Sequence, residues 1–233
     1  MGAKEAFAVD INLEGTIAGF TIDNNNVQHG FIRSPWGAFT SFDAPGAGTA
    51  AGEGTMVTLE SGLNVQGETI GWSVVAPSTA HGFVRERNGV ITLFDPPGSV
   101  FTVPGAINPE GLIVGGAYDA NFVLHGFVRN TNGAITTFDV PGAGSTPMSG
   151  EGTLALGVSV FGLSTGYWVD SSMIGHGFVR HPNGAILKFD APGAGAVSGS
   201  FQGTVPQGMN FWGEIVGYVV DTKSVAHGFI RIP

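Results

Sequence analysis

The chain has 233 residues, of which 42% are hydrophobic and 12% are charged, and its formal net charge is −9. Such an acidic balance disfavours nucleic acid and anionic membrane surfaces as partners. There is no cysteine, which excludes a disulfide framework and thiol chemistry, and no apolar run reaches the roughly 18 residues of a membrane-spanning helix.

One phrase, His-Gly-Phe-(Ile/Val)-Arg, recurs along the whole chain. Its five histidines are 52, 44, 51 and 51 residues apart, and a fixed period of this length predicts a repeat architecture. The chain begins directly in the first repeat, so no signal peptide is expected. We therefore predict one domain with repeats at about 1–45, 46–98, 99–141, 142–192 and 193–233. The phrase occurs at His29–Arg33, His81–Arg85, His125–Arg129, His176–Arg180 and His227–Arg231.

The third repeat shows the elements that we expect in each copy. An apolar stretch is followed by a turn at Pro109-Glu110-Gly111, a second β-rich run, and a third strand that carries the repeated phrase. Asn132-Gly133 then predicts a tight hairpin into the last strand, because Asn-Gly readily adopts positive φ angles. The four strands are predicted at Thr102–Asn108, Leu112–Tyr118, His125–Arg129 and Ile135–Asp139.

Four short antiparallel strands, repeated five times, predict an all-β fold: a five-bladed β-propeller with four antiparallel strands in each blade. The Phe-Asp-bearing last strand occurs only four times, so the fifth blade lacks it. Since a missing strand is tolerable only at an outer edge, this strand is expected outermost and the first strand is expected to line the axis. The edge beside His227–Arg231 is then open for pairing into a homodimer, unless Met1–Glu5 covers it.

The motif Ile-Asn-x-x-Gly-x-Ile-(Val/Ala)-Gly, then His-Gly-Phe, then Phe-Asp-x-Pro-Gly-Ala-Gly resembles the bacterial HAF-type extracellular repeats over essentially the whole chain. The family name has Ala between His and Phe, where this chain always has Gly. The resemblance implies a propeller-like protein outside the cytoplasm, extracellular or periplasmic, and implies no particular activity. The clearest copies are Ile11–Gly19 with His29–Phe31 and Phe42–Gly48, and Ile107–Gly115 with His125–Phe127 and Phe138–Gly144.

Each histidine of the repeated phrase is a candidate for two roles. An Asp follows it by fourteen residues in four repeats, and another precedes it by six residues in four repeats. The favoured interpretation is that His and Asp tie loops to strands; the alternative is a divalent metal site for zinc or calcium, with Asp orienting the His ligand. The repeated Arg is expected between blades, where it caps carbonyls or pairs with a carboxylate. The candidate metal ligands are His29, His81, His125, His176 and His227.

Positions where the copies differ are the better candidates for function. After the second-strand glycine the repeats carry Phe20, Trp72, Gly116, Tyr167 and Tyr218. We expect these aromatic residues either to fill the core between blades or, near the mouth of the propeller, to stack on a sugar or an aromatic ligand. Two loops, at Phe122-Val123-Leu124 and Met173-Ile174, are unusually apolar, as a pocket rim or a partner contact would be.

Three acidic residues also depart from the repeat pattern. Asp10 lies on the first strand, where other copies have Gly or Ala, and Glu53 and Glu151 both occur in Gly-Glu-Gly-Thr. They are the candidate catalytic residues, although a solvated carboxylate is the plainer interpretation of each. Glu60 is a further acidic position of the second repeat.

These patterns leave three hypotheses for function. The first is a carbohydrate or other small-ligand binding propeller that uses the loops of its upper face, with multivalency from its repeats. The second is a divalent-metal-dependent hydrolase of phosphoesters or esters, with a metal-activated water at the mouth of the propeller. The third is an interaction scaffold that uses the open edge of the fifth blade.

Overall fold

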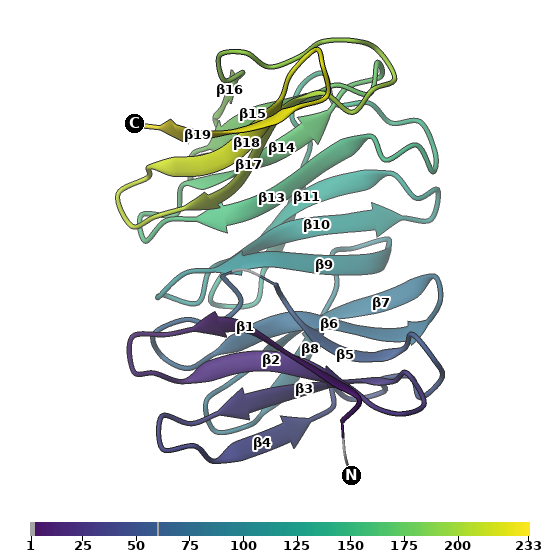
Figure 1. Cartoon of the computed structure of the whole chain (residues 1–233), viewed down its shortest axis with the longest axis vertical. Helices are drawn as coiled ribbons and strands as arrows, with labels where there is room; N and C mark the ends of the chain where they lie inside the picture. Colours follow the sequence, from purple (N-terminus) through teal and green to yellow (C-terminus); the bar gives the residue numbers. More distant parts are fainter. Residues whose placement is uncertain (1–2, 60) are drawn as a thin grey trace.

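The computed structural model is all-β and describes residues 3–59 and 61–233. Over these described residues, nineteen strands form one mixed sheet that divides into five repeats (Figure 1). Met1, Gly2 and Glu60 lie outside the described residues, and with them part of the predicted edge cover and one acidic candidate.

Repeats 1 to 4 each contain four strands, and repeat 5 contains three. Repeat 1 is β1 (Glu5–Ile11), β2 (Ile17–Ile22), β3 (Gln28–Arg33) and β4 (Phe39–Phe42); repeat 2 is β5 (Gly54–Val57), β6 (Thr69–Ala76), β7 (Thr79–Arg85) and β8 (Ile91–Phe94). Repeat 3 is β9 (Ser99–Ile107), β10 (Ile113–Asp119), β11 (Leu124–Arg129) and β12 (Ile135–Phe138). Repeat 4 is β13 (Gly152–Val158), β14 (Ser164–Val169), β15 (Gly175–Arg180) and β16 (Ile186–Phe189), and repeat 5 is β17 (Gly203–Met209), β18 (Ile215–Val220) and β19 (Ala226–Arg231).

Within each repeat, consecutive strands pair antiparallel in chain order. Among the described residues, the last strand pairs only with the third. It is largely exposed in repeats 1, 3 and 4. The first strand of repeat 4 contacts the first strands of repeats 3 and 5. This order agrees with the one expected from counting strands, in which the first strand is innermost and the last is outermost.

The first strands pack closely because glycine lets their backbones approach. A Cβ on Gly105 of β9 would lie 2.2 Å from the carbonyl oxygen of Ala155 in β13. A register shift occurs near this level in β1, β9, β13 and β17, and such a bulge bends a strand. The first strands can therefore converge without a steric clash.

Neighbouring repeats pack through two unlike faces. One buried cluster joins Ile70 and Val84 of repeat 2 to Ile113 and Phe127 of repeat 3. We call the side that carries Ile70 and Val84 the forward face and the side that carries Ile113 and Phe127 the rear face. The next interface repeats the arrangement, with Val114 and Val128 of repeat 3 packed against repeat 4.

The repeated arginine joins the same interfaces. The Arg129 guanidinium lies 5.0 Å from the ring centroid of Phe94 in the preceding repeat, and Arg85 and Arg180 lie in the same way over Phe42 and Phe138. These are cation–π contacts between repeats. Arg85 also donates a hydrogen bond to the carbonyl oxygen of Glu86, so the predicted capping of carbonyls is seen beside a stacking role that the sequence had not indicated.

The sheet is not closed into a ring. Among the described residues, β1 pairs only with β2 and β19 only with β18. Repeat 1 lies in the lower part of Figure 1 and repeat 5 in the upper part. The radial closure expected from a complete propeller is therefore absent from this arrangement. In the described part of the chain there is also no helix long and apolar enough to cross a bilayer.

Candidate functional site

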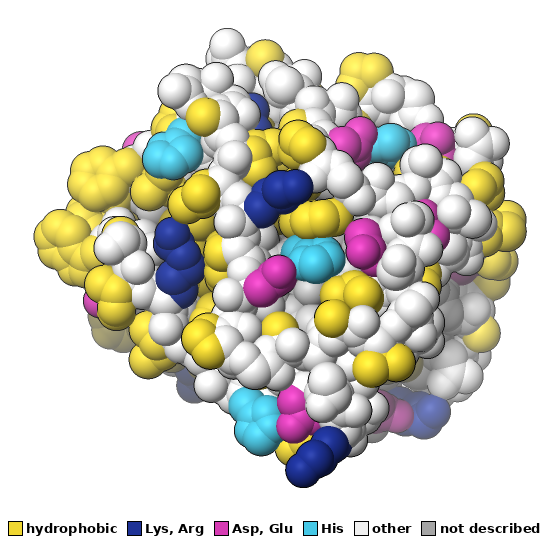
Figure 2. Space-filling model, turned by 90° about the horizontal axis from the view of Figure 1, so that it is seen from above, with side chains coloured by type: hydrophobic (Ala, Val, Ile, Leu, Met, Phe, Trp, Pro, Cys, Tyr) yellow, Lys and Arg dark blue, Asp and Glu magenta, His cyan; other side chains and the backbone are white. Residues whose placement is uncertain are grey.

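The repeated histidine pairs with the aspartate fourteen residues later. The backbone register sets Gly30 of β3 opposite Phe42 of β4, which brings His29 beside Asp43. The His Nδ1 to Asp carboxylate distance is 2.8 Å in repeat 1, and Figure 2 shows histidines with acidic neighbours at the surface. The expected pairing is confirmed in four repeats, and it ties the third strand to the loop that follows the fourth. The other three distances are 2.6 Å for His81–Asp95, 2.9 Å for His125–Asp139 and 2.9 Å for His176–Asp190.

The aspartate six residues before the histidine shapes the turn between the second and third strands. Asp119 Oδ1 accepts hydrogen bonds from the backbone amides of Asn121 and Val123 at 2.8 and 2.9 Å. These bonds, the one from Val123 foremost, hold the pKa of the Asp119 carboxyl below its ordinary value. Asp23 and Asp221 hold equivalent turns, and the pKa of each is lowered for the same reason.

The histidines sit one per repeat along the rim, each with its own carboxylates. In repeat 1, Nε2 of His29 lies 3.9 Å from Asp23 while Nδ1 bonds Asp43, so the two carboxylates lie on opposite sides of the ring. A metal ion needs its ligands to converge on one point. Within 3–59 and 61–233, no group of three or more His, Asp or Glu side chains is placed to hold a metal ion. Metal binding by these histidines therefore stays a prediction, and this geometry gives it no added support.

The two candidate catalytic glutamates bond to loop backbone. Glu53 Oε2 accepts a hydrogen bond from the Ala50 amide at 2.9 Å, and the buried Glu151 accepts one from the Thr146 amide at 2.9 Å. In repeat 5 the uncharged Gln202 takes the same place. Since an amide serves there equally well, the shared role is to fix the loop that precedes a first strand. Catalysis by these two glutamates stays a prediction, and their geometry gives it no further support.

Asp10 connects the first two repeats. Its carboxylate accepts hydrogen bonds from the amides of Ile11 at 2.8 Å and Leu63 at 2.9 Å. It also lines a cavity of about 560 Å³ where the ends of first strands from all five repeats meet. The structure thus places Asp10 in a solvent-accessible hollow near the axis, as predicted, with both oxygens already bonded to backbone.

The predicted aromatic contacts do not form one site. Phe20 is buried and stacks on Phe7 with ring centroids 5.0 Å apart. Trp72 lines a separate cavity of about 230 Å³ between first strands. Burial raises the pKa of Tyr167, with smaller effects from Tyr118 and Tyr218. Core packing accounts for Phe20, and Trp72 lines a cavity apart from it.

A different aromatic hollow lies at the rim between repeats 2 and 4. It has a volume of about 620 Å³ and is lined by Phe101, Tyr118, Phe122 and Met148, with Pro77 and Ser78 of the preceding repeat. The Tyr118 ring centroid lies 6.3 Å from that of Phe101 and 6.2 Å from that of Phe122. Burial raises the pKa of Tyr118 above its ordinary value. The rings therefore surround a cavity of a size usual for small ligands.

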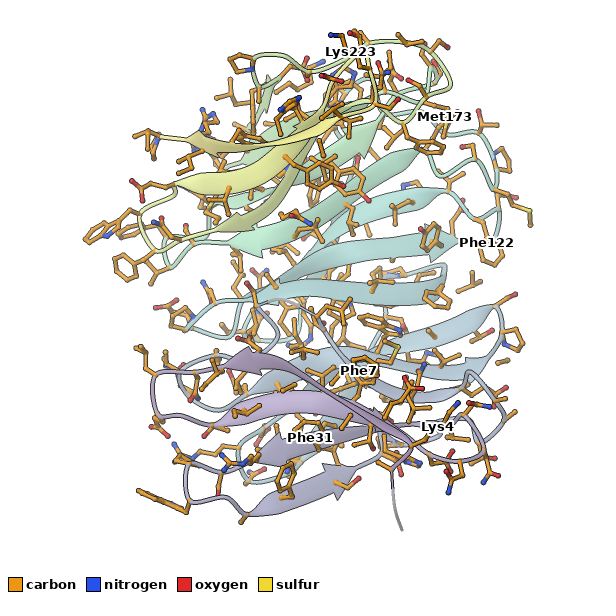
Figure 3. The ribbon with its side chains drawn as sticks, viewed as in Figure 1. Lys4, Phe7, Phe31, Phe122, Met173 and Lys223 are labelled. Carbon is orange, nitrogen blue, oxygen red and sulfur yellow. The ribbon has the colours of Figure 1, made fainter. Side chains whose placement is uncertain are left out.

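The backbone at this hollow is strained. Phe122 has a φ of 59° and Met148 a φ of 58°. The left-handed region is unfavourable for bulky side chains, and such strain gathers at binding and switch regions. The corresponding turn positions in repeats 1 and 5 hold Asn26 and Ser224. Figure 3 shows Phe122 and Met173 on loops at the same end of the strands.

The sequence held part of the signal for this site. The apolar loop at Phe122-Val123-Leu124 indicates a pocket rim, and Phe122 does line one. Phe101 and Tyr118 were not predicted as site residues, because their meeting depends on the pairing of β9 with β10. No model of a known protein family matches the chain, and comparison with curated proteins finds no match.

Proposed function

We propose that the five repeats are blades of a propeller-like protein that binds a small carbohydrate at the hollow lined by Phe101, Tyr118, Phe122 and Met148. The observation that carries the proposal is this cluster of half-buried aromatic rings around a cavity of about 620 Å³. Aromatic rings bind the apolar C–H faces of sugar rings, and the Tyr118 hydroxyl offers directional hydrogen bonding.

The ring geometry favours a ligand with several faces over a flat one. The planes of Phe101 and Tyr118 lie at 80°, and those of Tyr118 and Phe122 at 41°. Three rings at different inclinations present separate stacking surfaces around one volume. A sugar ring, which has an apolar face and polar edges, matches this combination of stacking surfaces with the Tyr118 and Ser78 hydroxyls.

Binding is favoured over hydrolysis because the candidate catalytic carboxylates already hold backbone amides. Asp10, Glu53 and Glu151 each accept at least one backbone hydrogen bond, and none of them lines the aromatic hollow. A metal-dependent hydrolase would instead need a carboxylate or histidine free to activate water near the bound substrate.

A pair of matched variants tests the proposal. Phe122→Asn removes the ring and places at this backbone conformation the residue type that Asn26 supplies in repeat 1. Met173→Asn makes the same backbone change in repeat 4, outside the hollow. Oligosaccharides are screened by saturation-transfer NMR, and hits are titrated by calorimetry.

We expect Phe122→Asn to weaken carbohydrate binding by about fivefold or more, because a lost stacking contact is worth roughly 1 kcal/mol or above. Met173→Asn should bind as the parent protein does. Equal binding by both variants, or the lack of any oligosaccharide that binds the parent protein, would contradict the proposal.

A further inference from the structure

The turns that follow the first strands place an apolar ring around the axial cavity. In each repeat an apolar residue comes directly after the Asn or Ser that begins this turn. All five of these residues line the cavity of about 560 Å³ to which Asp10 also belongs. The turns lie at the left in Figure 1, so the ring lies at that end of the strands. Its members are Leu13, Val65, Pro109, Val160 and Phe211.

Aromatic side chains extend this ring outward in repeats 4 and 5. Phe211 is 50% exposed, and its ring centroid lies 5.7 Å from that of Phe161 and 4.8 Å from that of Trp212. In repeat 1, Leu13 is 93% exposed. An exposed apolar patch beside a cavity is typical of a binding site. An apolar ligand can therefore contact the ring from solvent and continue into the cavity.

The cavity also reaches the open side of the sheet between repeats 1 and 5. Ile11 of repeat 1 and Met209 of repeat 5 both line it, although β1 pairs only with β2 among the described residues. Ile11 is 63% exposed, whereas Ile107, at the same place in repeat 3, is buried against repeat 2. Solvent therefore reaches the apolar wall of the cavity at Ile11.

The asparagines of these turns are engaged in joining the repeats. The side-chain amide of Asn12 donates to the carbonyl oxygen of Asn64 at 3.1 Å, and that of Asn64 donates to Asn108 at 3.2 Å. Asn108 donates in turn to the carbonyl oxygen of Ser159 at 3.0 Å. Their side-chain oxygens accept backbone amides of the same turns. The lining thus offers a ligand mainly apolar contacts, and it suits a sugar poorly.

Asp10 supplies the one charged side chain in the described lining. Its carboxylate is partly buried and is held in place by the backbone amides of Ile11 and Leu63, at 2.8 and 2.9 Å. A carboxylate oxygen accepts two hydrogen bonds, so each Asp10 oxygen has a further acceptor position. Among the described residues, Asp10 forms no ion pair with Lys, Arg or His. The cavity therefore disfavours anions and is complementary to a cationic hydrogen-bond donor.

We propose that the axial cavity binds an organic amine, with an apolar aliphatic or aromatic body and one ammonium group. The body packs against the apolar ring, and the ammonium group donates to Asp10. A calcium ion would need about six to eight oxygen ligands, which one carboxylate among apolar side chains does not supply. The cavity volume of about 560 Å³ is usual for a small ligand.

This site is separate from the aromatic hollow of the proposed carbohydrate site. The two cavities share no lining residue, and Ile107 and Phe101 belong to them at opposite ends of β9. Phe122, which lines the aromatic hollow, lies at the right in Figure 3, away from the turns that form the apolar ring. Amine binding can therefore be tested whether or not a sugar binds.

Three probes that differ only in their polar end group test the proposal on the whole chain at neutral pH. Phenylbutylamine is cationic, phenylbutanol is neutral and phenylbutyrate is anionic. Each is titrated into the isotope-labelled protein, and amide chemical shifts give the dissociation constant and the site. We expect phenylbutylamine to bind about fivefold or more tightly than phenylbutanol, because a hydrogen bond to a charged group is stronger than a neutral one, and phenylbutyrate to bind most weakly. The amides of Ile11 and Leu63 should shift most with the amine, since they bond the same carboxylate.

Variants separate the charge from the apolar ring. Asp10→Asn should bind phenylbutylamine and phenylbutanol with similar affinity, and this comparison within one variant is unaffected by a general loss of stability. Phe211→Ala should weaken both probes alike, by about threefold, because it removes apolar contact only. Trp36→Ala is the matched control, since Trp36 is 92% exposed and lies outside the cavity. It should bind all three probes as the parent protein does.

Several results would overturn the proposal. They are a parent protein that binds none of the probes or binds all three equally, and an amine preference that persists in Asp10→Asn. Amide shifts centred away from Ile11 and Leu63, or an equal loss of binding in Trp36→Ala and Phe211→Ala, would show contact with exposed rings elsewhere and would overturn it as well.

Discussion

Repeat 3 and repeat 5 carry nearly the same strands in very different surroundings. Val128 in β11 is 8% exposed, whereas Ile230, at the same place in β19, is 71% exposed. Both belong to the same repeated phrase. The difference teaches that burial in this molecule is set by the neighbouring repeat and not by the local sequence, as is general for stacked repeats that contact only their neighbours.

Replacing the repeated phenylalanine should give the largest difference in stability loss between repeat 3 and repeat 5. Phe127 is fully buried between repeats 2 and 3, while Phe229 is only half-buried. We expect Phe127→Ala to lower the free energy of unfolding by about 3–5 kcal/mol, and Phe229→Ala by about 1–2 kcal/mol, because the cost follows the apolar area lost and the cavity left. Urea denaturation of both variants measures the difference. Equal losses would show that repeat 5 is covered in solution.

Replacing the third-strand glycine by alanine should give a smaller difference in stability between the two repeats. A Cβ on Gly126 would lie 2.7 Å from the ring of Phe138, whereas a Cβ on Gly228 would meet nothing closer than 4.0 Å. Gly126→Ala should therefore lower stability by about 1–3 kcal/mol through overpacking. Gly228→Ala should leave it unchanged or raise it by about 0.4–1 kcal/mol, since alanine restricts the unfolded chain. Thermal melts of the two variants test this, and a large loss in Gly228→Ala would contradict the open position of repeat 5.

The turn aspartates of repeats 3 and 5 are expected to contribute alike to the pH dependence of stability. This is the smallest of the expected effects. Backbone hydrogen bonds lower the pKa of Asp119 in repeat 3 and of Asp221 in repeat 5. A lowered folded-state pKa contributes stability above the unfolded-state value of about 4 and loses it as pH falls through the folded-state pKa. Asp119→Asn keeps the oxygen acceptor but cannot titrate. As the pH is lowered from about 5 to about 2, the urea midpoint of this variant should therefore fall less than that of the parent protein. If the urea midpoints of the parent protein and the variant depend on pH in the same way, Asp119 does not contribute to the pH dependence of stability.

Much of the fold followed from the repeat. The period and the Asn-Gly hairpin predict four strands per repeat, and the third repeat shows them within a few residues of the expected bounds. The His–Asp pair was also predictable, because adjacent antiparallel strands bring residues fourteen apart together at one end of a hairpin. The open sheet was not predictable from the sequence, because the rotation between repeats depends on how side chains pack at each interface.

The candidate site was predictable only in part. The apolar loop at Phe122 was visible in the sequence, but the hollow also needs Phe101, Pro77 and Met148, which come from other repeats or loops. Nothing in the local sequence states that these segments meet. Equally, Glu53 and Glu151 look like free acids until the structure shows their loop amides.

By itself, the sequence determined an all-β chain of repeated antiparallel units, the order of strands within each unit and the pairing of each His with its Asp. These depend on local turn chemistry and on register, which are written in a short span of residues. Only the tertiary structure decided that the sheet stays open, that two apolar faces remain uncovered at its ends, and that three aromatic rings meet at one rim. These depend on contacts between units, where the packing of side chains distant in sequence sets the geometry.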